Sequence, residues 1–503
     1  MAKYRTTDVA AGQGLFLTVN LQEQLLPGSF EHMLNEIIGT KIDLSAFDKK
    51  YKNDITGASA VPPSALLKLV FYGYHSGCIS SRKIYELNNK NIIAKALTGD
   101  MEIHWTTIAD FISGNKEEVK ETFAQVLMYC NELGLIGGET SAVDGLRLPS
   151  NASMEMSGTE DQLEKRLAVC RKMAGKHIER HARKDAQGAS DDKTKKRFEK
   201  RQRQLNRRIE KIENFLKKME AKKGRDGKEI QSNVTDNESA MIHSSKGFIQ
   251  GYIGIAVSDQ KSQVITAAQA FGNANETEYL PEMLDKNAEN LQRAGVKKEE
   301  GTKPTILGDP NYYSEDNFRS CQERGVEAVI PDSQAKRRLG PDGQNRYDVD
   351  DFKYDEEGDC YECPNGKRLE YKRTTVQGGI EGKVYQASLT DCKACPKFAK
   401  CSWSKKEQGE LVQGKVLRVT KNNEHGCLCR DMRKKLETAK YQDKYADRIQ
   451  IVEPVFADIR NCKGLNRFTL RGKEKVNSQW LLYCMVHNLG KCLNGRNAVK
   501  NSA

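Results

Sequence analysis

The chain has 503 residues, more than one domain usually holds, so we expect several domains and at least one sizeable core. Its composition, 38% hydrophobic and 30% charged with no apolar run near ~18 residues, argues against a membrane protein. The net charge of +12 is modest for this length, so its distribution decides which partner it favours. The N-terminus lacks the layout of a secretory signal and the C-terminus lacks a lipidation motif, which predicts a cytoplasmic protein.

Residues 1–137 are predicted to form a helical domain. Apolar positions recur with a period of 3.6 in residues 64–77, 80–89, 91–100 and 116–134, and Pro62-Pro63-Ser64 is a helix-start signal. Short helices joined by tight turns suggest a DNA-binding domain of the helix-turn-helix kind. A small helical bundle that does not bind DNA has the same pattern, so both interpretations stay open.

Residues 159–222 are predicted to form a basic helical hairpin. The stretch from Asp191 to Lys228 contains 16 Lys and Arg residues but only 7 Asp and Glu residues. The second helix has an apolar seam formed by Leu205, Ile209, Ile212, Leu216 and Met219, and the first has a matching stripe of Leu163, Leu167, Cys170 and Met173. The hairpin is either a solvated coiled coil or a surface for DNA phosphates. The candidate phosphate contacts are Lys195, Lys196, Arg197, Lys200, Arg201 and Arg203.

Residues 138–340 change to an α/β pattern. Strands are predicted in residues 139–148, 247–259, 262–272, 304–313 and 326–332, punctuated by Gly, Asn, Asp and Pro. Helices are predicted in residues 280–295 and 314–325. Strands followed by strand–helix–strand alternation predict a mixed sheet in this block.

Residues 341–430 contain a cluster of cysteines. Fourteen cysteines in a chain without a secretory signal are expected to be thiols or metal ligands. Two C-x-x-C pairs, 28 residues apart and followed by one more cysteine, match the knuckles of a structural zinc site. The five residues are Cys360, Cys363, Cys392, Cys395 and Cys401. Five exceed the four ligands of a tetrahedral ion, and a loop with reduced thiols is the alternative.

Residues 431–503 are predicted to be mainly helical, with strong helical patterns in residues 444–460 and 476–493. A strand is predicted just before them, in residues 410–420. The remaining cysteines near this end are expected to be buried free thiols, namely Cys427, Cys429, Cys462, Cys484 and Cys492.

Three acids lie at the ends of predicted strands or inside an apolar stretch of a predicted helix. Asp144 and Asp309 end apolar strand patterns, and Glu453 lies between apolar residues of a predicted helix. Acids at the ends of buried strands are costly unless they meet a cation, and three of them could hold two divalent ions for phosphoryl transfer. Acids that cap turns or face solvent are the ordinary alternative.

Several blocks together resemble the DDE transposases of bacterial insertion sequences, in the branch with a cysteine-rich insertion before the last catalytic acid. The matching blocks are residues 61–86, 96–111, 142–153, 306–317, 363–367, 392–401 and 445–476, in the family's order. The resemblance implies a ribonuclease-H-like mixed-sheet core with a helical N-terminal domain, a helical-hairpin insertion and a small zinc-ribbon-like insertion. It implies core segments at residues 138–340 and 431–503.

The resemblance also assigns roles to residues. Asp144, Asp309 and Glu453 look like the three ligands of two Mg²⁺ or Mn²⁺ ions. The family's DNA-contacting residues around the Glu look like Tyr445, Arg448 and Arg460, although Arg448 is one residue farther from Glu453 than usual and Arg460 replaces a Lys. After Asp309, Pro310 and Asn311 also stand where the family pattern has small residues before the aromatic residue. The family's cysteine elements match Cys363, Cys392, Cys395 and Cys401 as ligands of one structural Zn²⁺, which leaves Cys360 as a bystander.

The resemblance implies an enzyme that binds the terminal inverted repeats of its element, cuts the phosphodiester there and joins the 3′-hydroxyl to target DNA. DNA is therefore the expected partner, with no membrane and no small-molecule substrate, in the bacterial cytoplasm near the nucleoid. Cutting two ends together favours a homodimer or larger synaptic assembly. The alternatives are an inactive or repurposed transposase-derived DNA-binding protein and a nuclease without strand transfer.

Overall fold

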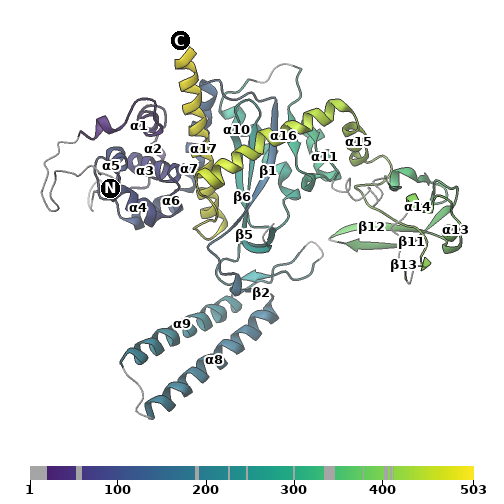
Figure 1. Cartoon of the computed structure of the whole chain (residues 1–503), viewed down its shortest axis with the longest axis horizontal. Coiled ribbons are helices and arrows are strands. Elements are labelled where there is room, and N and C mark those ends of the chain that lie inside the picture. Colours follow the sequence, from purple (N-terminus) through teal and green to yellow (C-terminus); the bar gives the residue numbers. More distant parts are fainter. Residues whose placement is uncertain are drawn as a thin grey trace, which may run out of the picture.

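The computed structural model describes residues 20–51, 59–186, 192–224, 227–244, 247–297, 301–332, 346–377, 379–401, 406–407, 410–411 and 413–502. Figure 1 shows a helical N-terminal region beside a central sheet, a long helical hairpin that projects away from them, and a small sheet at the opposite side from the N-terminal helices.

Short helices make up the N-terminal region, where the sequence predicted them. They are η1 (Gln22–Gln24), α1 (Phe30–Thr40), α2 (Ser45–Asp48), α3 (Pro63–His75), α4 (Ser81–Lys90), α5 (Ile92–Thr98), α6 (Trp105–Gly114) and α7 (Lys116–Glu132). Several of these helices begin at a proline or at a serine whose side chain caps the first turn. Pro63 occupies the first turn of α3, and the hydroxyls of Ser29 and Ser80 accept hydrogen bonds from the backbone at the starts of α1 and α4.

The central sheet is mixed and has six strands. They are β1 (Thr140–Pro149), β4 (Ala240–Ser244), β5 (Gly247–Asp259), β6 (Ile265–Phe271), β7 (Thr305–Gly308) and β8 (Glu327–Val329). The order is β4-β5-β1-β7-β8, and β6 also pairs with β5. β1 pairs antiparallel with β5 and parallel with β7, and β8 is parallel to β7. The predicted strands and the predicted mixed sheet are confirmed, except that the strand predicted in residues 304–313 ends at Gly308 and η4 (Pro310–Tyr312) follows, because Pro310 cannot donate to a strand pair.

Helices cover both faces of this sheet. Alternate residues of β1 point to opposite faces, so Ala142 packs with α16 (Ala439–Ala457) while Val143 packs with α10 (Leu280–Arg293) and α11 (Glu315–Glu323). Two shorter 3-10 helices, η3 (Thr277–Tyr279) and η4 (Pro310–Tyr312), precede α10 and α11. This layered arrangement fits the expected ribonuclease-H-like core.

The N-terminal helices and the sheet share one hydrophobic core. The long helix α17 (Lys473–Ser502) packs against β6 on one side and α7 on the other, between the two regions in Figure 1. Gly254 on β5 lets the ring of Trp480 approach closely, because a Cβ there would lie 2.9 Å from the indole. The indole Nε1 donates a hydrogen bond of 3.1 Å to the Ile255 carbonyl. The position of the N-terminal region relative to the sheet is therefore fixed by packing.

The basic hairpin is formed by α8 (Glu160–Ala186) and α9 (Asp192–Leu216), and it is attached through the short pair β2 (Ser157–Gly158) and β3 (Ser232–Asn233) after η2 (Met154–Met156). Ile212 of the predicted seam packs against Leu163 and Leu167 of the same chain. The predicted stripe was wrong at one position: Met173 is 55% exposed, and Ala174 is buried instead. The helix turns Met173 outward because the buried series runs through Cys170 and Ala174, four residues apart.

The cysteine-rich insertion forms a second, antiparallel sheet of five strands in the order β15-β12-β11-β10-β9. These are β9 (Lys353–Asp355), β10 (Cys360–Glu362), β11 (Arg368–Gln377), β12 (Ile380–Ala387) and β15 (Val416–Val419), preceded by η5 (Val349–Asp351). The short elements α13 (Leu389–Lys393), α14 (Phe398–Cys401), β13 (Lys406–Glu407) and β14 (Glu410–Leu411) lie between β12 and β15. Its own small core includes Phe352, Tyr361, Leu369 and Tyr385.

The chain returns to the central sheet through α15 (Leu428–Leu436) and α16, followed by a π-helix, η6 (Asp458–Cys462), and α17. Four of the five late cysteines are buried, but the prediction was wrong for Cys462, which is exposed in the π-helix. None of the described helices is long and apolar enough to cross a membrane.

Candidate active site

The parallel pairing of β1 and β7 brings two aspartates together. Val143 pairs with Gly308, so Asp144 and Asp309 follow aligned residues on neighbouring strands. The backbone N–H of Gly145 donates to Asp144 Oδ1 at 2.7 Å, and the N–H of Asn311 donates to Asp309 Oδ1 at 2.6 Å. Each carboxylate therefore has one oxygen held by the backbone, and the other remains available for a further partner.

A guanidinium group lies against both of the remaining oxygens. Arg448 Nη2 is 2.6 Å from Asp144 Oδ2 and 3.9 Å from Asp309 Oδ2. Arg448 is buried on the face of α16 that packs on the sheet, and its Nε has no hydrogen-bond partner among the described residues. A buried cation with unused donor capacity beside two carboxylates marks this point as one where positive charge is needed.

The electrostatics of the site also favour a cation. Burial raises the pKa of Asp144 to about 6, although Arg448 and the Gly145 N–H oppose this, and the nearby carboxylates of Asp309 and Glu276 raise it further. Burial and the charges of Glu276, Asp144 and Asp309 also raise the pKa of Tyr312, which is buried in η4 directly after Asp309. Burial is the largest cause of both shifts, so a cation bound here would offset mainly the cost of burying these groups in their charged form.

Tyr445 lies near the aspartates, one turn before Arg448. Its pKa is raised by burial, with Asp309 and Asp144 adding to the effect, and Arg448 lowering it. Arg460 is exposed in the π-helix after α16. Of the residues expected around Glu453, Tyr445 and Arg448 thus lie at the aspartates, and Arg460 faces solvent.

Glu453 is exposed on α16, whereas Arg448 on the same helix is buried and contacts the aspartates. Five residues after Arg448 on an α-helix, it lies about 140° around the axis from that side chain. Its neighbours Ile451 and Val452 pack against the sheet. Within the described part of the chain, no three His, Cys, Asp or Glu side chains are grouped to hold a metal ion.

Asp144 and Asp309 nevertheless fit a magnesium ion. Mg²⁺ retains several waters in proteins and is commonly bound by one or two carboxylates together with substrate phosphates, so a complete protein cage is not required. Two carboxylates whose free oxygens already share one guanidinium are close enough to share a cation, and each is oriented by a backbone N–H.

Three residues of the site were not predicted from the sequence. Glu276 is 4% exposed between β6 and α10, and its Oε1 accepts hydrogen bonds from Arg147 Nη2 at 2.7 Å and from Asn311 Nδ2 at 3.0 Å. Of the three, only Asn311 is singled out by the sequence, and only because it departs from the family pattern, not as a site residue. Glu276 follows Asn and Ala in a loop and looks like an ordinary acid before a helix.

Four of the five clustered cysteines lie near one another, although among the described residues they are not grouped closely enough to hold a metal ion. Burial raises the pKa of the Cys401 thiol, which Lys415 lowers, and Cys392, Cys363 and Cys395 are close enough to raise it further. Backbone N–H groups of Lys367 and Lys415 donate to Cys363 Sγ and Cys392 Sγ, each at 3.3 Å. The remaining thiol, Cys360, is 3.7 Å from the carboxylate of Asp355.

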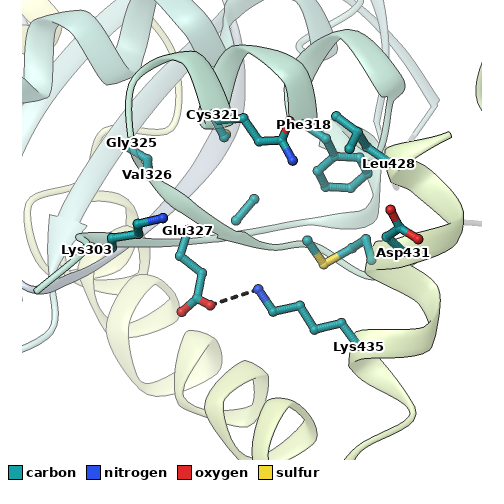
Figure 2. Close-up of a pocket in the computed structure, with 12 residues that line it drawn as sticks. Lys303, Phe318, Cys321, Gly325, Val326, Glu327, Leu428, Asp431 and Lys435 are labelled. Atoms are coloured by element: carbon teal, nitrogen blue, oxygen red, sulfur yellow. Dashed lines mark hydrogen bonds and ion pairs between the residues drawn. The ribbon is translucent and has the colours of Figure 1, made fainter. Parts of the chain in front are cut away.

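An ion-pair cluster holds α15 and α16 to the edge strand β8. Figure 2 shows Glu327 facing Lys435 at a pocket between α11, β8 and α15, whose lining includes neither of the two site aspartates. Glu327 Oε1 accepts from Lys435 Nζ at 2.8 Å and Tyr441 Oη at 2.9 Å, and Oε2 accepts from Lys444 Nζ at 2.9 Å. Lys444 precedes Arg448 by one turn, so this cluster helps to fix the helix that carries Arg448 and Glu453.

We expect Glu327→Gln to destabilise the protein at neutral pH. Burial opposes ionisation of Glu327, but the hydrogen bonds from Lys435, Lys444 and Tyr441 outweigh it and lower the pKa from 4.5 to about 2. A carboxylate with a lowered pKa contributes stability above about pH 4.5 that is lost as the pH falls towards 2. Thermal unfolding of wild type and variant should therefore differ by roughly 1 kcal/mol at pH 7 and converge in acid. Glu289→Gln, an exposed change, is the control, and a constant difference at every pH would contradict the assignment.

Two segments of the chain match known protein families. Residues 362–493 match a family described as a transposase DDE domain. Residues 19–114 match a family described as a transposase domain (DUF772). The first segment contains Tyr445, Arg448 and Glu453, and the second covers α1 to α6. No curated protein sequence matches the chain.

Proposed function

Because the chain belongs to the DDE transposases of insertion-sequence type, we propose that it cuts DNA at the ends of its element and joins the freed 3′-hydroxyls to target DNA. The observation that carries this proposal is the convergence of Asp144 and Asp309 on Arg448. The terminal inverted repeats of the element are the proposed substrate, and the helices that match the second family are their proposed reader.

In this proposal Asp144 and Asp309 hold divalent cations, Mg²⁺ or Mn²⁺. Two such ions would supply Lewis-acid chemistry at the attacking and leaving oxygens of the phosphodiester. The backbone N–H groups of Gly145 and Asn311 orient the two carboxylates before substrate arrives. This orientation reduces the entropy that must be lost when the reacting atoms are aligned.

Arg448 acts as a temporary counter-charge in the proposed cycle. Its guanidinium neutralises the aspartates in the absence of cation, and it turns to a DNA phosphate when cation and DNA are bound. Tyr445 lies beside it, and Arg460 is exposed to contact phosphates farther along the duplex.

Glu453 is the proposed third acid. To reach the cations, α16 must rotate or shift from the position described above. Pro454 removes a backbone N–H immediately after Glu453, and the π-helix η6 follows α16 directly. The regular hydrogen bonding of α16 is thus interrupted where such a shift is required.

We also propose that the four neighbouring cysteines, Cys363, Cys392, Cys395 and Cys401, hold one structural Zn²⁺ as a zinc ribbon. N–H···S bonds to Cys363 and Cys392 and the proximity of all four thiols support this. Four thiolates leave no open position for water, so this ion has no part in the chemistry.

The basic hairpin is proposed to bind DNA phosphates. The six basic residues, Lys195, Lys196, Arg197, Lys200, Arg201 and Arg203, are all exposed on α9. They lie in the half of α9 that is farther from the central sheet (Figure 1). The hairpin is also a candidate for the contact between two copies in a synaptic dimer.

Changing these six residues to Gln should weaken binding to any DNA. The slope of log K against log salt should flatten by about 0.9 for each phosphate that the variant no longer neutralises, whereas preference for the element ends should survive, because phosphate contacts do not read bases. Fluorescence anisotropy at several salt concentrations measures both. Lys372→Gln, exposed on β11, is a control, and an unchanged slope in the six-residue variant would exclude the hairpin from DNA binding.

The proposed function is tested with purified protein and linear DNA that carries the element ends. We expect specific nicks at the ends and joined products in Mg²⁺, and neither in EDTA. End binding without cleavage in Mg²⁺ or Mn²⁺ would favour the repurposed DNA-binding protein, and cleavage without joined products would favour the stand-alone nuclease.

A further inference from the structure

Glu276 is a buried acid with one oxygen unused. Oε1 accepts from Arg147 and Asn311, but Oε2 is inaccessible to solvent and has no hydrogen-bond partner in the part of the chain that the structure describes. Oε2 points at the β1 backbone beside Asp144: a Cβ on Gly145 would lie only 2.2 Å from it. An unsatisfied buried carboxylate oxygen is costly to folding, so packing alone does not account for an acid here.

Glu276 is connected to both aspartates. Asn311 links it to Asp309, because the Asn311 side chain donates to Glu276 while its backbone N–H donates to Asp309. Glu276 is also close enough to Asp144 to raise the pKa of that carboxyl. The arrangement places a third negative charge beside the two carboxylates that face Arg448.

Arg147 compensates this charge only in part. Its side chain is 33% exposed, and Nη1 donates to the carbonyl of His243 on β4 at 3.1 Å. Solvent therefore screens the guanidinium more than it screens the buried carboxylate. Burial raises the pKa of Glu276, whereas Arg147 and Asn311 lower it, so these two partners favour a negative charge beside the aspartates.

We propose that Glu276 is a positioning residue of the cation site, which orients Asp309 through Asn311 and raises the affinity of the two aspartates for divalent cation. This inference rests on the proposed function, since it presumes that Asp144 and Asp309 bind the cation. Glu276 itself does not need to touch the ion. Its effect comes through the hydrogen bond to Asn311 and through its charge.

The test compares Mn²⁺ binding by wild type and Glu276→Gln in the absence of DNA, using calorimetry and the electron paramagnetic resonance signal of free Mn²⁺. The Gln oxygen can still accept from Arg147 and Asn311, so the variant removes the charge and keeps the shape. We expect Kd for Mn²⁺ to rise roughly tenfold, because one unit charge is removed a few ångströms from the ion and Arg147 is left uncompensated. Glu282→Gln, whose side chain is 42% exposed in the first turn of α10, should leave Kd unchanged.

A second variant separates position from charge. Asn311→Ala keeps the Glu276–Arg147 pair and the backbone N–H that donates to Asp309, but it removes the side-chain hydrogen bond that joins Glu276 to this turn, and it should raise Kd severalfold. If Glu276→Gln unfolds in thermal melts, Asn311→Ala decides the question. An unchanged Kd in a folded Glu276→Gln variant, or in Asn311→Ala where the former does not fold, would overturn the inference. Wild type that binds no Mn²⁺ would overturn the proposed cation site and this inference with it.

Discussion

Asp144→Asn and Asp309→Asn are each expected to reduce cleavage of DNA that carries the element ends below detection. Asn retains the Oδ1 that accepts from the Gly145 or Asn311 N–H, so the local backbone should be preserved. The variant lacks the negative charge and the second oxygen that a divalent cation requires. End binding should persist or strengthen, because a negative charge near the phosphates is removed.

The measurement is gel analysis of nicked and joined products in Mg²⁺, with mobility shift for binding. Asp316→Asn is a suitable control, since Asp316 on α11 is exposed and forms an ion pair with Lys421, away from the two aspartates. It should cleave at the wild-type rate. A variant of Asp144 or Asp309 that cleaves as wild type would remove that residue from the catalytic site.

If the four cysteines bind zinc as proposed, its removal is expected to unfold the cysteine-rich insertion. Its separate core is small, with nine buried residues in the part of the insertion that the structure describes, so a structural ion would supply much of its stability. Cys363→Ser and Cys395→Ser should each lose about one zinc per chain in metal analysis. Limited proteolysis should then cut within residues 346–419, whereas wild type with zinc should resist.

Cys360→Ser is the matched control for these variants. Cys360 is buried in strand β10 of the same insertion, and its thiol contacts the Asp355 carboxylate. This variant should retain zinc and protease resistance. Loss of zinc from Cys360→Ser, with zinc retained in Cys363→Ser, would show that a different set of four binds the ion.

The two aspartates and helix α16, which carries Glu453, are held in position by different parts of the structure. Asp144 and Asp309 are fixed by strand pairing, whereas Arg448 and Glu453 are carried by α16, which is held at β8 by Glu327. A rotation or shift of α16 would therefore replace Arg448 by Glu453 at the aspartates without disturbing the sheet. The Glu327 and Asp144 variants test these two parts separately.

The sequence by itself indicated the family, most of the long helices and the central strands other than β4, but it did not predict the strands β9 to β12 of the second sheet. The period of apolar residues placed the helices α3, α7 and α10, and short apolar runs ended by Gly and Asp placed β1 and β7, because these patterns reflect local geometry. The order of motifs was sufficient to indicate the transposase family, which the family matches support.

Only the tertiary structure decided which side chains meet. Asp144 and Asp309 were candidates from their positions at strand ends, but Glu276 had no local signal, because its role depends on the hydrogen bonds of Arg147 and Asn311 and on the missing side chain of Gly145. Arg448, and not Glu453, contacts the aspartates, because the rotation of α16 on the sheet sets which face is buried. Helical periodicity fixes the spacing of side chains on a helix, whereas packing against the sheet fixes the direction in which they point.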